Sequence, residues 1–349
     1  MNGTIYMPVG EVCSSISDTY REKKNMVTLI NTSDVLEGRV LNHERVPNSN
    51  LKGQFKKTFQ RDDILYSEIR PQNRRFAYVD FSPIDYIAST KLMVIRAKKD
   101  VVSPKYLYYF LKNSSTVAEL QLLAETRSGT FPQITFSEVA NLTIPVPSLA
   151  VQEVIVQTMQ CLEDKITCNE QINDNLQQQA QAIYSSMFID NSESAWTHGH
   201  LSDLVTVKYG KDHKKLSEGI YPVYGSGGIM RYVERPLYDK ESVLIPRKGT
   251  LNNVMYVNQP FWSVDTMFYT EMKLPNVAKF VYHFVKAKDL ASMNAGSAVP
   301  SMTTDILNAM EVVIPSASAL EEFEALVAPM YEAIRICRRI ILPTPRRKY

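Results

Sequence analysis

The sequence predicts an α+β fold in which two similar mixed α/β domains are separated by two long helices that form an antiparallel coiled coil. The prediction rests on an internal repeat, on two helical seams, and on a length of 349 residues, which is enough for two domains with separate cores. We expect a first domain over 1–148, a long helix over 149–190, a second domain over 191–316, a shorter helix over 317–342 and a basic tail over 343–349.

The repeat appears in two segments that share their order of turn, strand and helix. Pro132 and Pro147 of the first copy correspond to Pro300 and Pro315 of the second, and both pairs are 168 residues apart. Chance similarity rarely keeps register through a turn, a strand and the start of a helix. The sequence therefore predicts a duplicated unit made of a globular part and a helix.

The globular part of the first copy combines short β-rich runs with proline-marked turns. The runs at 63–67 and 86–95 are strand candidates, and Pro71, Pro83 and Pro104 punctuate them. The aromatic run at 106–111 predicts a helix with a counterpart at 280–285 in the second copy. We assign this aromatic stripe to the core.

The segment from Ala150 to about Phe188 has the clearest periodicity in the chain. Two interleaved series of seven-residue steps form an a/d seam of the coiled-coil type. Such a helix would span about 58 Å at 1.5 Å per residue. Asn169 and Asn173 lie on the seam, where a buried polar residue costs stability and can set the register of pairing.

The second helical segment begins with a capping-box pattern at Ser318 and Glu321. Its apolar residues alternate in steps of three and four, so the two helices are expected to pair, and the intervening domain returns the chain to make them antiparallel. The side chains expected to form the helix-pairing seam are Ile155, Met159, Leu162, Ile166, Leu176, Ile183, Phe323, Val327, Met330 and Ile334.

Composition and charge exclude several classes of protein. The formal net charge of +2 is too small to indicate nucleic-acid binding by itself, although basic residues cluster locally. No run approaches a membrane span and the start has no signal-peptide pattern, so we expect a cytoplasmic protein without a membrane partner. The four cysteines lack CxxC spacing and are expected to be reduced.

The sequence contains no recognisable catalytic or metal site. The run 225–228 is rich in glycine but lacks the Lys-Ser/Thr of a phosphate-binding loop. His198 and His200 have no third ligand at a useful spacing. Motifs of serine hydrolases, zinc deaminases and DNA methyltransferases are absent from the sequence. The chain is therefore expected to recognise a partner and to leave chemistry to others.

With its repeat, its seams and five short motifs, the chain resembles the specificity (S) subunit of type I restriction-modification systems. The motifs are Ile64-Leu65-Tyr66-Ser67-Glu68-Ile69-Arg70-Pro71, Ile144-Pro145-Val146-Pro147 followed by Gln152 and Ile155, Tyr221-Pro222-Val223-Tyr224-Gly225-Ser226-Gly227-Gly228, Leu244-Ile245-Pro246-Arg247-Lys248-Gly249-Thr250, and Ser263-Val264-Asp265-Thr266. The resemblance covers nearly the whole chain.

The resemblance implies a non-catalytic subunit in which two target-recognition domains each read one half of a bipartite site in double-stranded DNA. It also implies docking of methyltransferase (M) subunits, which methylate adenine, and of a restriction (R) subunit. This chain would hold no cofactor and no metal, while S-adenosylmethionine, ATP and Mg would bind to the partner subunits.

Arginine and lysine anchor phosphates, whereas polar side chains read base edges. On that basis the residues expected near DNA in the first domain are Ser67, Arg70, Arg74, Arg75, Arg127, Ser128 and Thr130. Those expected in the second domain are Tyr224, Ser226, Gly227, Arg247, Lys248, Asn252, Asp265 and Thr266.

The chain departs from the family in its second helix, whose pattern stops near Ile341 and corresponds to about 36 Å. Part of the first seam is therefore expected to lack an intramolecular partner, which predicts weakened or one-sided M docking, or self-association. The alternative from another class is a self-associating coiled-coil scaffold that binds proteins and has no DNA specificity. A fused methyltransferase would require the chain itself to bind S-adenosylmethionine.

Overall fold

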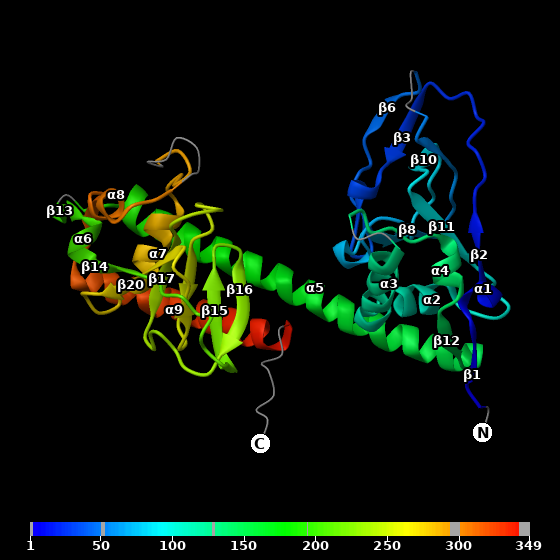
Figure 1. The fold of residues 1–349 in the computed structure, drawn as a ribbon. Coiled ribbons are helices and arrows are strands. Elements are labelled where there is room, and N and C mark those ends of the chain that lie inside the picture. Colours follow the sequence, from blue (N-terminus) through cyan, green and yellow to red (C-terminus); the bar gives the residue numbers. More distant parts are fainter. Residues whose placement is uncertain (1–2, 50–52, 128–129, 194, 294–300, 342–349) are drawn as a thin grey trace. The chain divides into compact units, whose positions relative to one another are not determined.

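The computed structural model describes residues 3–49, 53–127, 130–193, 195–293 and 301–341. The chain forms two compact units, and the boundary between Glu163 and Asp164 lies inside the long helix α5 (Leu149–Ser185) (Figure 1). Each unit combines β-sheets with helices, which confirms the predicted α+β class.

The first unit contains two four-stranded sheets. One is antiparallel with the order β2-β11-β8-β9, and the other has the order β6-β3-β10-β7, with β3 and β10 parallel. The ribbons β1-β12 and β4-β5 complete its strands. These strands are β1 (Ile5–Pro8), β2 (Cys13–Ile16), β3 (Met26–Ile30), β4 (Val35–Leu36), β5 (Arg39–Val40), β6 (Arg45–Pro47), β7 (Phe55–Lys57), β8 (Ile64–Ser67), β9 (Phe76–Tyr78), β10 (Tyr86–Ser89), β11 (Leu92–Ala97) and β12 (Thr143–Val146).

Helices pack against the antiparallel sheet of the first unit. The core between them contains Ile95, Leu107 and Leu120, all fully buried. Pro104 starts α2, where its fixed φ suits the first helical turn. The helical elements are α1 (Val9–Val12), α2 (Pro104–Lys112), α3 (Ser114–Arg127), α4 (Phe136–Ala140) and the short turns η1 (Thr32–Asp34) and η2 (Pro71–Asn73).

The second unit repeats this plan. Its antiparallel sheet has the order β14-β20-β17-β18, and a smaller sheet has the order β16-β15-β19. The strands are β13 (Thr197–His200), β14 (Val205–Tyr209), β15 (Glu218–Gly225), β16 (Gly228–Val233), β17 (Ser242–Pro246), β18 (Met255–Val257), β19 (Trp262–Ser263), β20 (Met267–Met272) and β21 (Glu311–Ile314). The helical elements are α6 (Leu201–Leu204), α7 (Ala278–Lys286), α8 (Thr304–Asn308), α9 (Ala317–Ile341) and a π-helical turn, η3 (Ser186–Asp190).

The repeat read from the sequence is a structural repeat. Helices α4 and α8, strands β12 and β21, and helices α5 and α9 begin at positions that differ by the same 168 residues as the repeated prolines. Thr135 and Thr303 are the N-cap residues of α4 and α8, so the same local chemistry starts both helices.

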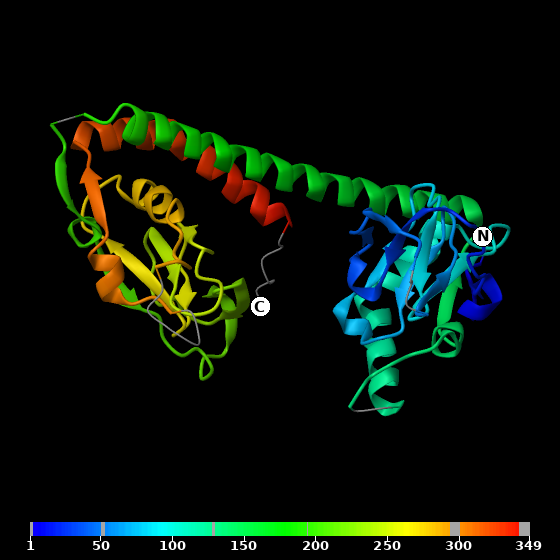
Figure 2. The same cartoon turned by 90° about the horizontal axis from the view of Figure 1, so that it is seen from above.

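Within the second unit, α9 lies along the C-terminal half of α5 (Figure 2). The rings of Tyr184 and Phe188, near the end of the first helical segment, lie 6.2 Å and 5.1 Å from the ring of Phe323, near the start of α9. Further along, His283 of α7 contacts both Gln181 and Tyr331. These contacts confirm the predicted antiparallel pairing of the two helices.

The predicted seam divides into a covered part and an exposed part. Phe323, Val327 and Ile334 are buried, and Leu176, Ile183 and Met330 are half-buried. Ile155, Met159, Leu162 and Ile166 are instead exposed, by 37%, 38%, 53% and 38%. The prediction that these four residues pair is therefore wrong for the described chain, whereas the prediction that part of the seam stays open agrees with their exposure.

Candidate nucleic-acid interface

In the first unit, the loop that follows the central strand β8 pairs with the segment that precedes α4. The amide of Ile134 donates to the carbonyl of Glu68 at 2.9 Å, and the amide of Arg70 donates to the carbonyl of Pro132 at 3.1 Å. Ile69 and Gln133 face each other in an antiparallel bridge between these bonds. Strand β8 is buried along its whole length, so it holds the loop at a fixed place on the sheet.

The second unit contains the same arrangement at equivalent places. After the buried central strand β17, Lys248 forms an antiparallel bridge with Ser301, and the amide of Met302 donates to the carbonyl of Arg247 at 2.9 Å. Ser301 corresponds to Gln133 at the 168-residue offset of the repeat. Both units therefore present a basic loop that is bonded to the same repeated segment.

The basic loop of the first unit has two arginines in the left-handed region. Arg70 (φ 44°) and Arg74 (φ 51°) flank the turn η2, a conformation that costs energy for residues other than glycine. The Arg74 guanidinium donates to Oγ of Ser114 at 2.8 Å, and that of Arg75 donates to the carbonyl of Ser33 at 2.9 Å. Arg70 is exposed, and its guanidinium makes no hydrogen bond or ion pair with the described residues.

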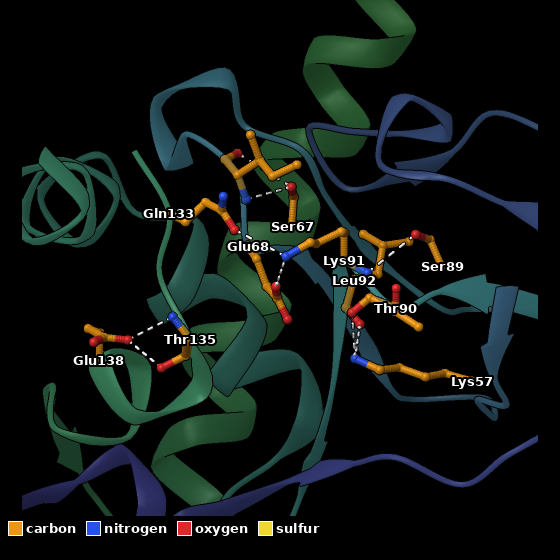
Figure 3. A network of polar contacts seen from close by, with 11 residues as sticks. Lys57, Ser67, Glu68, Ser89, Thr90, Lys91, Leu92, Gln133, Thr135 and Glu138 are labelled. Carbon is orange, nitrogen blue, oxygen red and sulfur yellow. Dashed lines mark hydrogen bonds and ion pairs between the residues drawn. The ribbon is translucent and has the colours of Figure 1, made fainter. Parts of the chain in front are cut away.

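Next to this loop lies a polar network (Figure 3). Nζ of Lys91 lies 3.4 Å from a carboxylate oxygen of Glu68 and donates to Oε1 of Gln133 at 3.1 Å. Nζ of Lys57 donates to the carbonyls of Thr90 and Leu92. Burial, opposed by the negative charge of Glu68, lowers the pKa of Lys57 below its usual value. Lys91 and Gln133 were missed by sequence reasoning, although Gln133 lies inside the repeated segment.

Two residues predicted near DNA in the first unit, Ser67 and Arg127, are engaged within the unit. Ser67 is 2% exposed and its Oγ accepts the amide of Ile69 at 3.0 Å, so it shapes the loop and presents no hydroxyl to solvent. Arg127 forms an ion pair with Glu138 at 2.8 Å. Thr130 is exposed. Ser128 lies outside the described residues.

In the second unit, Arg247 is held by three contacts. Its amide donates to the carbonyl of Thr266 at 2.9 Å, its Nη1 donates to the carbonyl of Asp265 at 3.1 Å, and its guanidinium lies 5.6 Å from the ring centre of Tyr209. The last two contacts restrict the side chain, so less conformational entropy would be lost when it binds a ligand. Tyr209 is half exposed and was not predicted.

The tip of the β15–β16 hairpin packs beside this basic loop. Nδ2 of Asn253 donates to the carbonyl of Ser226 at 2.7 Å, and the amide of Val264 donates to the carbonyl of Tyr224 at 3.1 Å. Gly249 has φ +85°, and a Cβ on it would lie 2.7 Å from Oγ of Ser226. The structure therefore brings together most residues predicted for the second unit, namely Tyr224, Ser226, Gly227, Arg247, Lys248, Asp265 and Thr266.

Asn252 departs from the prediction because both ends of its amide are engaged inside the unit. Its Nδ2 donates to the carboxylate of Asp289 at 3.0 Å, and its Oδ1 accepts the amide of Ala291 at 3.0 Å. The hydrogen bond from Asn252 lowers the pKa of Asp289 below its usual range. Asn252 therefore organises a loop, and Asn253 makes the contact with the hairpin.

The sequence of the chain matches a known family over most of its length. The sequence pattern of the type I restriction modification DNA specificity domain matches residues 6–178 and 193–322. The chain belongs to this family. The match confirms the family that the resemblance predicted.

Two curated relatives extend the comparison. The chain is 44% identical over 164 residues to the Type I restriction enzyme HindI specificity subunit of Haemophilus influenzae, a match covering 47% of this chain and 36% of that protein. It is 23% identical over 305 residues to the MjaIX specificity subunit of Methanocaldococcus jannaschii, a match covering 72% of this chain and 70% of that protein. The chain thus spans about a third of the first relative and about two thirds of the second.

Solved structures show the same fold. The S subunit from M. genitalium aligns with a TM-score of 0.54 and 16% identity over 99% of this chain and 97% of its own. A chain from a study of complex assembly and conformational transition of the type I R-M system aligns with a TM-score of 0.50 and 15% identity over 98% of this chain and 97% of its own.

The described residues contain neither a candidate membrane-spanning helix nor a candidate metal site. There, no helix has the length and apolar character needed to cross a membrane. No group of three His, Cys, Asp or Glu side chains is arranged to hold a metal ion within the same residues.

Proposed function

We propose that this chain reads double-stranded DNA with two target-recognition domains, residues 1–148 and 191–316, each of which contacts one half of a bipartite site. The repeated loop carries the proposal: in both units a basic loop after the buried central strand is bonded to the segment that precedes α4 or α8. Duplicate surfaces on one chain suit a target with two halves, because two linked modules bind far more tightly than either alone.

In the second unit, Lys248 supplies an exposed charge for a phosphate, while Arg247 and Ser226 supply donors for base edges. In the first unit, the corresponding contacts to phosphates and base edges are made by Arg70 and the Lys91–Gln133 pair. The two loops differ in their side chains, as expected if they read different half-sites.

The names of the relatives support a partner assignment. We propose docking to methyltransferase (M) subunits that methylate adenine and to a restriction (R) subunit, with S-adenosylmethionine, ATP and Mg bound by those partners and the whole acting in the cytoplasm. The alternative to M docking is self-association, in which the exposed part of the long helix pairs with a second copy of this chain.

Methylation-sensitive sequencing of the host genome before and after deletion of this chain tests the proposal. We expect a bipartite methyladenine motif that disappears on deletion. Unchanged methylation, together with weak DNA binding that does not respond to salt, would support the scaffold alternative.

A further inference from the structure

The hairpin of β15 and β16 ends in a two-residue turn, Ser226-Gly227, beside the basic loop of the second unit (Figure 1). It carries two consecutive apolar side chains that are exposed, Ile229 by 39% and Met230 by 62%. Consecutive residues of a regular strand point to opposite faces of a sheet, and this sheet packs on a core that includes Val223 and Val233. Exposure of both neighbours therefore needs a local cause.

A β-bulge in β16 is that cause. Val223 of β15 pairs with Arg231, and the next residue, Tyr224, pairs with Ile229. Met230 is therefore the extra residue between the two pairs. A bulge turns a side chain away from the direction that a regular strand would give it, and bulges are common beside functional sites.

The side chain of Met230 lies across Gly225, which has no side chain of its own. A Cβ on Gly225 would lie 2.5 Å from Sδ and 3.2 Å from Cγ of Met230, and 3.8 Å from Cγ2 of Val264. The glycine therefore leaves the space that the thioether occupies. Val264 precedes Asp265, whose carbonyl accepts Nη1 of Arg247 at 3.1 Å. Met230 and Arg247 thus lie beside adjacent residues of one segment.

An exposed methionine next to hydrogen-bond donors suits one chemical feature of DNA. In the major groove, thymine presents a C5-methyl group, whereas the remaining groups that distinguish the bases there are hydrogen-bond donors and acceptors. A thioether side chain is apolar, polarisable and adaptable, so it can pack against such a methyl group. Arginine and serine side chains cannot recognise that group through hydrogen bonds.

We propose that Met230 is a specificity residue that packs against the C5-methyl group of a thymine in the half-site of the second unit. This rests on the proposed function, because it needs the hairpin tip to lie in the major groove. The first unit differs at this place: its strands β3 and β6, which pair antiparallel as β15 and β16 do, are joined by residues 31–44 in place of a two-residue turn. The contact is therefore expected in one half of the target.

Selection of bound duplexes from a random pool tests the proposal with the intact chain. Met230→Gln keeps the length of the side chain and removes its apolar character, whereas Met230→Leu keeps that character. We expect the native chain to select a bipartite motif, and Met230→Gln to lose the preference for thymine at one position while keeping the rest. Met230→Leu and the control Leu274→Ala, at a residue of the same unit that is 40% exposed, should select the native motif.

Deoxyuridine then tests the methyl group itself, because it keeps the hydrogen-bonding groups of thymine and lacks the C5-methyl. Replacing the identified thymine by deoxyuridine should weaken binding of the native chain by about fourfold, the value of one buried methyl group. The same replacement should leave binding by Met230→Gln unchanged. Fluorescence anisotropy titrations of the matched duplexes measure both effects.

Three results would overturn this proposal alone. The first is a Met230→Gln chain that selects the native motif, and the second is native binding that does not respond to deoxyuridine. The third is equal weakening by deoxyuridine for the native and Met230→Gln chains, which would assign the methyl group to another residue. A native chain that selects no motif would overturn the proposed function as well. Circular dichroism checks that each variant folds.

Discussion

The Nε2 of His283 lies 2.8 Å from the hydroxyl oxygen of Tyr331, and this contact links helix α7 to helix α9. The other ring nitrogen, Nδ1, lies 2.8 Å from Oε1 of Gln181 in α5. One buried imidazole therefore connects three helices of the second unit. Burial, assisted by the positive charge of Lys286, lowers the pKa of His283 to about 4.

The low pKa predicts a loss of stability in mild acid. The unfolded histidine takes up a proton near pH 6.5, whereas the folded one resists until about pH 4, so the free energy of unfolding falls as the pH drops through this window. The full loss is on the order of 3 kcal/mol. Urea unfolding of the native chain and His283→Gln at pH 7.5 and 5 measures it. A similar fall in both proteins would contradict the assignment.

The buried ion pair of Asp63 and Arg96 is expected to stabilise the first unit. The guanidinium donates to both carboxylate oxygens at 2.7 Å, and the Asp63 side chain is 1% exposed. Arg96→Met leaves a buried carboxylate without its cation and should cost about 3 kcal/mol. Lys24→Met, which removes an exposed pair with Glu22, should cost under about 1 kcal/mol. If chemical unfolding shows that both variants lose the same free energy of unfolding, the burial of Asp63 does not strengthen the contribution of its ion pair.

Lys248 and Arg247 are expected to differ in their effects on DNA binding. Lys248→Ala should weaken binding to all sequences and reduce the slope of log affinity against log salt by about 1, as expected for one phosphate contact. Arg247→Ala should also relax sequence preference. Lys240→Ala, at another exposed lysine of the second unit, is the control for charge alone. DNA titrations at several salt concentrations measure these slopes. If Lys248→Ala and Lys240→Ala give the same slope of log affinity against log salt, Lys248 does not contact a phosphate.

Gly249→Ala should disturb the interface of the second unit more than its core. The new Cβ would meet Oγ of Ser226 at 2.7 Å, and φ +85° is strained for alanine, at a cost of about 1–3 kcal/mol. We expect weaker DNA binding with little change in the unfolding of the first unit. Gly53→Ala, where nothing lies within 4 Å of the added Cβ, should behave like the native chain. Unchanged DNA binding by Gly249→Ala would argue against this loop.

The two asparagines on the covered part of the α5 seam are expected to lower stability. Nδ2 of Asn169 and Oδ1 of Asn173 are buried and have no hydrogen-bond partner among the described residues. Asn169→Leu should raise the free energy of unfolding by about 1–3 kcal/mol, and it should allow other registers of pairing. The exposed Gln171→Leu serves as the control in thermal unfolding and light scattering. A less stable Asn169→Leu chain would show that the polar layer is satisfied in solution.

The sequence by itself determined the repeat, the α+β class and the two long helices. These depend on local information: the shared order of turn, strand and helix, the proline offsets, and the three- and four-residue spacing of apolar residues. The chemistry of such signals lies within a few residues of where they act, so it can be read without the fold. The residues around Arg247 and Ser226 were also predicted in this way, because the motifs that carry them are continuous in sequence, and their contact with DNA stays a prediction.

Only the tertiary structure decided which polar side chains remain available and which seam residues are covered. Ser67 and Asn252 were expected at the DNA surface, yet the fold buries Ser67, and the partners of Asn252 come from a loop about forty residues away. Leu162 and Met330 hold equivalent places in two similar seams, but an antiparallel helix packs beside only the second. Burial and hydrogen-bond partnership are non-local, because they depend on segments that the fold brings together from distant parts of the chain.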